Sequence, residues 1–174
     1  MRYTILARLL HWVTALAILV IGMLGFWLAW APPPDEAFKL RLYNLHESLG
    51  VTLFLLTLLR LAWRWRHPPP PIHPPLPRWM HRAAAANHAA LYALLLAMPP
   101  VGLMATNAWG FPLKAFDLVP VPSPVGPDQA LAPLLTALHG WMALALLLLL
   151  LAHIGAAAWH TLVRRDDTLR RMGF

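Results

Sequence analysis

The sequence predicts an all-α integral membrane protein, built as one four-helix bundle with both termini in the cytoplasm. The chain of 174 residues is 59% hydrophobic and only 12% charged, which is about half the charged fraction of an ordinary soluble domain. It contains four apolar segments, each long enough to cross a hydrocarbon core of roughly 30 Å. Little length remains for a separate soluble domain, so we expect residues 1–174 to form a single domain.

The four helices are expected at residues 5–30, 43–65, 82–107 and 133–163. The first follows Arg2 and Arg8 as the apolar part of a signal peptide would. It is too long for that role and has no clear small-residue cleavage site, so we expect a retained helix. The connector after the second helix is rich in proline and cannot be helical, and a second proline-rich connector precedes the fourth helix.

The basic residues are unevenly distributed between the two ends of this bundle. Of the 14, eleven lie near the termini or around the connector between the second and third helices, and three, Lys39, Arg41 and Lys114, lie on the other side. Cytoplasmic loops of membrane proteins are enriched in lysine and arginine, so this distribution places both termini in the cytoplasm. The same bias accounts for the net charge of +7, and we expect no nucleic-acid partner.

Histidine is the residue type that points to chemistry. The chain has no cysteine, which excludes disulfides, thiolate-bound iron–sulfur clusters and covalently attached c-type haem. Ionisable groups inside a membrane are costly unless paired or ligated, so a histidine within a helix is a candidate functional residue. Six are candidates: His11, His46, His88, His139, His153 and His160. The other three, His67, His73 and His81, lie in or beside the first proline-rich connector, where we expect them to be solvated.

The two histidines His139 and His153 give the strongest pattern. Fourteen residues at 100° each return to within about 40° of the same direction, so both lie on one helix face, about 21 Å apart. One haem could not use both, but two haems near opposite membrane surfaces could. His46 lies at the depth of His139, and His11 at the depth of His153. We therefore predict two haem b groups: iron held by His46 and His139 on the periplasmic side, and by His11 and His153 on the cytoplasmic side. Such six-coordinate iron suits electron transfer.

Several positions leave alternatives open. A single histidine here could instead be hydrogen-bonded to a neighbouring helix. His88 or His160 could replace a cytoplasmic ligand, although we expect both to lie around the haem, near its propionates or a quinone. Arg60 could pair with a propionate, but we expect it to extend to the membrane surface.

Six glycines could make room for a flat macrocycle beside a helix: Gly22, Gly25, Gly50, Gly102, Gly140 and Gly155. Gly50 and Gly140 lie close to proposed ligands, which favours these two for that role. Ordinary close packing of helices explains the others equally well.

The order and spacing of five fragments resemble the bacterial cytochrome b561 family. The fragments are Ala7–Trp12, Asn44–Gly50, Arg60–Arg64, Asn87–Tyr92 and Ala152–Gly155. The resemblance covers the whole chain. It implies a four-helix, di-haem b protein of the bacterial inner membrane that exchanges electrons with ubiquinone, and one branch of the family oxidises superoxide at its periplasmic face. The ligand histidines of the family match His11, His46, His139 and His153.

We therefore expect an oxidoreductase that passes electrons across the lipid bilayer, oxidising superoxide and reducing ubiquinone. No catalytic residue stands out, but Lys39, Arg41 and Lys114 could attract the superoxide anion. The alternative is a haem-b subunit that anchors a periplasmic dehydrogenase or hydrogenase and relays electrons from this redox partner protein. A third, less favoured interpretation is a haem-free membrane scaffold or transporter.

Overall fold

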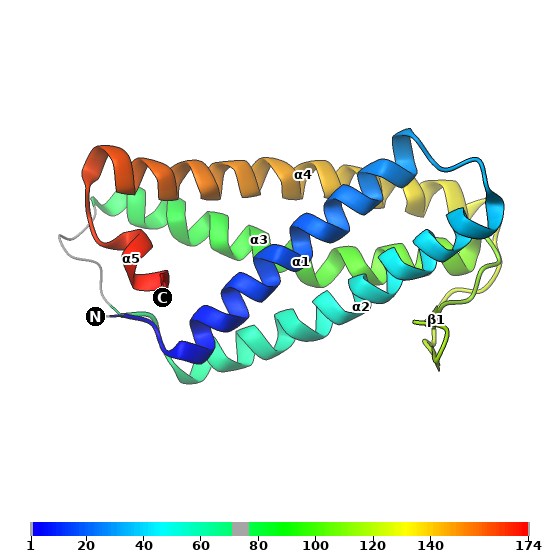
Figure 1. Ribbon diagram of the computed structural model, residues 1–174, viewed down its shortest axis with the longest axis horizontal. Coiled ribbons are helices and arrows are strands. Elements are labelled where there is room, and N and C mark those ends of the chain that lie inside the picture. The colour runs from blue at the N-terminus through cyan, green and yellow to red at the C-terminus, as the bar shows by residue number, and fades with distance from the viewer. Residues whose placement is uncertain (1, 71–76, 174) are drawn as a thin grey trace.

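The computed structural model describes residues 2–70 and 77–173, and its main feature is four long helices (Figure 1). They are α1 (Ile5–Trp30), α2 (Glu36–Arg66), α3 (Arg78–Ala108) and α4 (Leu131–Trp159). Each is long and apolar enough to cross a membrane. The predicted all-α, four-helix membrane fold is confirmed, and the bounds of α1 agree with those expected.

The start of α2 differs from the prediction. The helix begins at Glu36 rather than at residue 43, because the Asp35 carboxylate accepts a hydrogen bond from the Phe38 N–H at 2.6 Å and caps the helix. The apolar run alone does not reveal this polar first turn. As a result, Lys39 and Arg41 lie on the first turns of α2 and not in a connector.

Two other helix ends also differ. α3 begins at Arg78, directly after Pro77, so that His81 belongs to the helix. α4 continues into a π-helical turn, η1 (His160–Arg164), which ends where Arg165 adopts a left-handed backbone with φ of 53°. A short helix, α5 (Thr168–Met172), follows.

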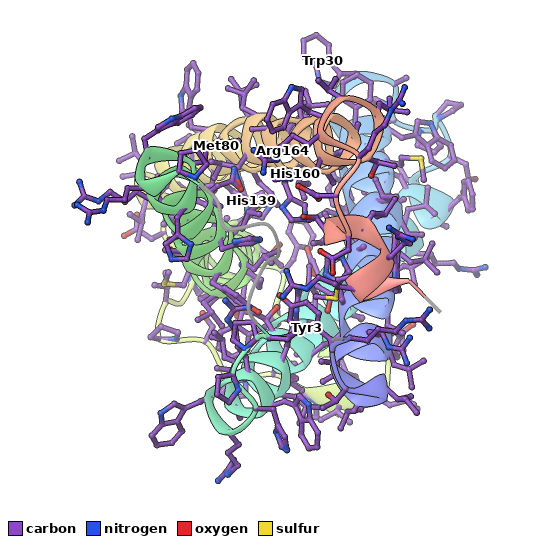
Figure 2. All side chains as sticks on the ribbon, turned by 90° about the vertical axis from the view of Figure 1, so that its left-hand side faces the viewer. Tyr3, Trp30, Met80, His139, His160 and Arg164 are labelled. Atoms are coloured by element: carbon purple, nitrogen blue, oxygen red, sulfur yellow. The ribbon has the colours of Figure 1, made fainter. Side chains whose placement is uncertain are left out.

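The helices pack in chain order around a common interior, α1 against α2, α2 against α3, and α3 against α4 (Figure 2). Both termini, the end of α2 and the start of α3 lie at one end of the bundle, which we call the terminal end (Figure 1). The connectors from α1 to α2 and from α3 to α4 lie at the other end. The shared position of the termini agrees with an even number of membrane crossings.

The connector after α3 contains a small hairpin that the sequence analysis did not predict. Its strands, β1 (Lys114–Ala115) and β2 (Val119–Pro120), pair antiparallel. The hairpin is attached to α2, because Asn44 Nδ2 donates to the Lys114 carbonyl at 2.9 Å and the Phe116 N–H donates to Ser48 Oγ at 2.7 Å. We call this end of the bundle the hairpin end.

The middle of the bundle is filled by an aliphatic cluster to which all four helices contribute. Its buried members are Ile18 and Ile21 on α1, Leu53 on α2, Leu91 and Leu95 on α3, and Leu146 on α4. Burial of a large aliphatic side chain against its neighbours contributes dispersion contacts that lipid alone would match less closely. This aliphatic cluster therefore determines which faces of the four helices point to the interior, toward the terminal end as well as toward the hairpin end.

The chain after α4 folds back onto the start of α1 as a C-terminal clasp (residues 165–173). Arg8 Nη1 donates to the Gly173 carbonyl at 2.6 Å. Trp12 Nε1 donates to the Met172 carbonyl at 2.9 Å. The clasp thus joins the last residues of the chain to the first helix at the terminal end.

Asp166 holds the turn that starts the clasp. Its side chain is only 2% exposed and accepts hydrogen bonds from His160 Nδ1 at 2.6 Å and Arg164 Nε at 3.0 Å. It also accepts from the Thr168 N–H at 3.0 Å. Burial alone would raise the pKa of this carboxyl, but hydrogen bonds from Thr168, His160 and Arg164 outweigh burial and hold the pKa below its usual range.

We expect Asp166→Asn to loosen the clasp. A carboxyl whose pKa is lowered by folding stabilises the fold above its unfolded pKa, near 3.9, and this contribution is lost as pH falls through the folded pKa. In the native protein, amide exchange at residues 168–172 should therefore stay slow from neutral pH down to about pH 4. In Asp166→Asn it should be faster by roughly tenfold or more throughout this range, since hydrogen bonds to a charged group are lost.

Hydrogen exchange followed by mass spectrometry in nanodiscs measures this effect. Asp128→Asn is the matched control, because Asp128 accepts from the backbone N–H groups of Ala130 and Leu131 at the start of α4, far from the clasp. Unchanged exchange at residues 168–172 in Asp166→Asn would contradict the role given to this carboxylate.

Candidate functional site

The structure brings four of the candidate histidines together in two pairs. The hairpin-end pair is His46 on α2 and His139 on α4, whose ring centroids are 6.2 Å apart. The terminal-end pair is His11 on α1 and His153 on α4, with the same centroid separation of 6.2 Å. These are the two pairs that the comparison of depths selects from the sequence.

The two pairs lie on opposite sides of the aliphatic cluster. On α4, His139 precedes Leu146 of the cluster by seven residues and His153 follows Leu146 by seven. Seven residues of helix rise about 10.5 Å. Figure 2 shows His139 inside the ring of helices, whereas Trp30 points outward. Each pair is therefore an interior site near one end of the bundle.

The separation within each pair fits one metal held between two imidazoles. A bond from a metal to an imidazole nitrogen is about 2 Å long, and that nitrogen lies about 1.1 Å from the ring centre, so two coaxial rings on one metal have centres about 6.2 Å apart. Both pairs meet this requirement. The rings of His88 and His153 are closer, at 5.2 Å, which is too short for the same arrangement.

His139 is held in the tautomer that a ligand through Nε2 requires. Its Nδ1 lies 3.2 Å from the Met98 carbonyl oxygen on α3. A carbonyl can only accept, so Nδ1 carries the proton and the Nε2 lone pair is free. Metal-bound histidines in proteins are commonly oriented by such a bond.

Two glycines make room for the hairpin-end pair. A Cβ added to Gly25 on α1 would lie 2.7 Å from His46 Cε1, and one added to Gly102 on α3 would lie 2.9 Å from His139 Cε1. A Cβ added to Gly50 or Gly140, the two glycines that the sequence favoured, would meet nothing within 4 Å, and their place beside a macrocycle stays a prediction. The glycines that contact the histidine rings, Gly25 and Gly102, come from neighbouring helices.

Glu47 is a further polar residue at the hairpin end. Its carboxylate accepts a hydrogen bond from Thr106 Oγ1 at 2.5 Å and so joins α2 to α3 beside the hairpin-end pair. The preceding residue, His46, has a buried Nδ1 with no hydrogen bond of good geometry to any described residue. The position of the His46 ring, 6.2 Å from the ring of His139, is compatible with a ligand role.

The remaining histidines are placed differently. His88 on α3 contacts His153 and therefore borders the terminal-end pair. His160 is bound to Asp166 in the turn before the clasp. His67 is exposed and stacks on Trp63, with ring centroids 3.9 Å apart, and His81 is exposed on α3. His73 lies outside the described residues.

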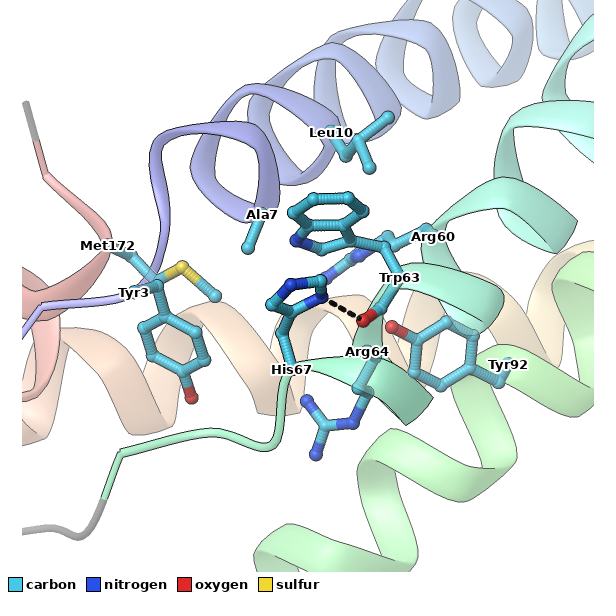
Figure 3. Close-up of a pocket in the computed structure, with 9 residues that line it drawn as sticks. All are labelled: Tyr3, Ala7, Leu10, Arg60, Trp63, Arg64, His67, Tyr92 and Met172. Atoms are coloured by element: carbon cyan, nitrogen blue, oxygen red, sulfur yellow. Dashed lines mark hydrogen bonds between the residues drawn. The ribbon is translucent and has the colours of Figure 1, made fainter.

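Arg60 does not extend to the membrane surface as expected. Its Nη2 donates to His11 Nδ1 at 2.8 Å, and its guanidinium carbon lies 5.4 Å from the centre of the Tyr92 ring. Together with Arg64 and Trp63 it lines a pocket at the terminal end (Figure 3). The terminal-end pair therefore has positively charged side chains, Arg60 and Arg64, on one side.

The three basic residues at the hairpin end are not equivalent. Lys39 is paired with the Glu36 carboxylate at 2.7 Å. Arg41 and Lys114 are exposed. The Lys114 backbone is bound to Asn44, two residues before His46 on α2. Arg41 and Lys114 are thus better placed than Lys39 to act on an anion in solution.

The chain matches a known family along its length. Residues 2–174 match the family described as prokaryotic cytochrome b561. The protein belongs to the prokaryotic cytochrome b561 family. Membership makes it a multi-pass bacterial membrane protein of electron transfer, and it implies that the chain binds haem b.

Individual relatives agree with this assignment. Cytochrome b561 homolog 2 of Escherichia coli K12 is 32% identical over 171 residues, covering 98% of this chain and 90% of the relative. Cytochrome b561 homolog 1 of the same organism is 31% identical over 165 residues, covering 94% and 92%. A protein of Yersinia pestis named probable superoxide oxidase CybB is 28% identical over 176 residues, covering 98% and 95%.

We expect Gly25→Ala to disturb the hairpin-end pair. The new methyl group would overlap the His46 ring, and relief of such overpacking in a packed interior costs about 1–3 kcal/mol. The variant should lose haem and show a shifted absorption spectrum after purification. Gly22→Ala on the same helix is the matched control, because its Cβ would meet nothing within 4 Å. Equal haem content and equal spectra in the two variants would contradict this assignment.

Proposed function

We propose that this cytochrome b561 family member binds two haem b groups and carries electrons across the bacterial inner membrane. The observation that supports this most directly is the pair of histidine sites, each with ring centroids 6.2 Å apart, on opposite sides of the aliphatic cluster. His46 and His139 would hold one haem, and His11 and His153 the other. Haem supplies one-electron redox chemistry at each site when bound.

The protein's own residues orient the sites and limit what they can do. α4 contributes one histidine to each site, so a single straight helix sets the distance between them. His139 is fixed by the Met98 carbonyl, and Gly25 and Gly102 let the two rings of the hairpin-end pair approach. With two histidines holding each haem, the iron would have no open position for oxygen, which would favour electron transfer.

The distribution of charge supports the orientation that we propose. Eleven of the 14 basic residues belong to the terminal end, and three, Lys39, Arg41 and Lys114, belong to the hairpin end. The preference of lysine and arginine for cytoplasmic loops supports an orientation with the terminal end in the cytoplasm and the hairpin end in the periplasm.

We propose superoxide as the electron donor and ubiquinone as the acceptor. A relative named probable superoxide oxidase, 28% identical, supports this choice. Two superoxide anions would each give one electron and become dioxygen. Ubiquinone would take the two electrons and two protons and become ubiquinol. Arg41 and Lys114 would attract the anion at the hairpin end.

We expect the two histidine sites to be separable by substitution. His139→Ala should remove mainly one haem and His153→Ala mainly the other, because each variant would lack one of the two histidines that would hold that haem. Dithionite-reduced spectra and haem-to-protein ratios measure the loss. His81→Ala is the control, since this exposed histidine lies on α3 outside both pairs. A full content of haem in both ligand variants would overturn the assignment.

We expect Arg41→Ala with Lys114→Ala to slow electron transfer from superoxide. Attraction between an anion and exposed cations raises the association rate and is screened by salt, so the double variant should react several-fold more slowly at low ionic strength and depend less on salt. Stopped-flow haem reduction measures the rate. Lys39→Ala is the control, because Lys39 is paired with Glu36.

Reduction of the purified protein by superoxide also distinguishes the proposed function from the alternative role as a relay subunit of a periplasmic dehydrogenase. If superoxide reduces neither haem, while a large periplasmic dehydrogenase co-purifies and reduces both, the protein is a relay subunit and the proposed substrate is wrong. An unchanged rate and salt dependence in the double variant would remove only the role of Arg41 and Lys114.

A further inference from the structure

While Arg60 donates a hydrogen bond to His11 Nδ1, His11 cannot ligate iron through Nε2. A guanidinium can only donate hydrogen bonds, so His11 Nδ1 accepts the bond at 2.8 Å. A neutral His11 then carries its proton on Nε2, which has no lone pair free for iron. His139 shows the opposite and competent tautomer, with Nδ1 facing the Met98 carbonyl. Iron ligation through Nε2 of His11 therefore requires Arg60 to have a partner other than His11 Nδ1.

We propose that Arg60 pairs with the propionate carboxylates of the haem that the terminal-end pair holds, and not with His11 Nδ1. This inference rests on the proposed function. With Arg60 on the propionates, Nδ1 of His11 can carry the proton and Nε2 can ligate iron. Keeping both contacts would require His11 to lose both ring protons. Arg60 is thus a positioning residue that acts on the ligand and on the cofactor's charged edge.

The surroundings of Arg60 favour a carboxylate as its second partner. It is partly buried in a membrane helix, where an unpaired cation is costly. Its neighbours in the pocket are Trp63, Tyr92 and Arg64, of which Arg64 carries the same positive charge. None of the described residues lining the pocket is acidic (Figure 3). A carboxylate on a bound group would supply this missing counter-charge. Arginine binds carboxylates through two parallel hydrogen bonds, which gives the pairing both strength and orientation.

The competing arrangement is that Arg60 remains on His11 and His88 takes its place. His88 already contacts His153, but the rings are 5.2 Å apart, compared with 6.2 Å for His11 and His153. Replacement by His88 would require the α3 and α4 rings to separate. Movement of one arginine side chain is the smaller change.

The test compares the binding of haem b and of its propionate diester to the native chain and to Arg60→Gln. The full-length protein is prepared without haem and titrated with haem b, or with haem b whose two propionates are methyl esters. The native chain and Arg60→Gln are then compared in how strongly the terminal-end pair retains its haem. That haem is identified as the one that His153→Ala removes. We expect Arg60→Gln to weaken retention of haem b by about tenfold or more, because a charge-assisted bond is lost. It should change retention of the diester less than about twofold, since that bond is already absent.

Two further variants control for structure. Arg60→Lys should restore part of the retention of haem b, because it keeps the charge but not the planar donor pair. Arg66→Gln should behave as the native chain, because Arg66 is exposed at the end of the same helix. Redox titration gives an independent reading: with haem b, Arg60→Gln should move one haem to lower potential and leave the other unchanged, since a nearby positive charge favours the reduced form.

The outcomes separate the two proposals. If His153→Ala removes one haem but Arg60→Gln weakens haem b and the diester equally, or weakens neither, the inference about Arg60 is wrong and the proposed function stands. If His88→Ala removes that haem and His11→Ala does not, the inference about Arg60 is wrong, and His88 replaces His11 in the proposed ligand set. If His153→Ala leaves both haems bound, the assignment of the sites fails, and with it the inference.

Discussion

The structure depends on holding two imidazole rings at one depth, about 6 Å apart, inside a bundle of apolar helices. An uncompensated polar ring in a membrane interior is costly, so each histidine has to meet a ligand, a carbonyl or another side chain. The chain meets this requirement twice, at the hairpin-end pair and at the terminal-end pair. The aliphatic cluster between them sets the facing of the helices, and α4 carries one histidine of each pair on the same face.

The fold and the pairing were predictable from the sequence, because both depend on regular quantities. Length and hydropathy locate four helices, and a spacing of fourteen residues puts His139 and His153 on one face. The start of α2 was missed because Asp35 caps a polar turn that lies outside the apolar run. The small hairpin was missed because two-residue strands carry too little pattern to detect.

The details of the site depend on contacts between residues of different helices. Positions along the chain do not reveal which of these residues meet. Gly25 and Gly102 contact rings that belong to other helices, so distance along the chain could not identify them. Arg60 was expected at the surface because long cationic side chains usually reach water from a helix end. Its actual partner, His11, lies on a different helix, and only the packing of α1 against α2 brings them together.

The aliphatic cluster also has a consequence for how the proposed electron transfer would respond to the membrane voltage. Its buried members are isoleucines and leucines, which can neither carry nor store a proton. An electron that passes from the hairpin end to the terminal end therefore crosses this layer without a compensating charge. In the proposed orientation it moves toward the negative side of the membrane, against about 2.3 kcal/mol per 100 mV for a full crossing. Under the proposed function and orientation, electron transfer through this bundle would be electrogenic, and its driving force would fall as the cell energises its membrane.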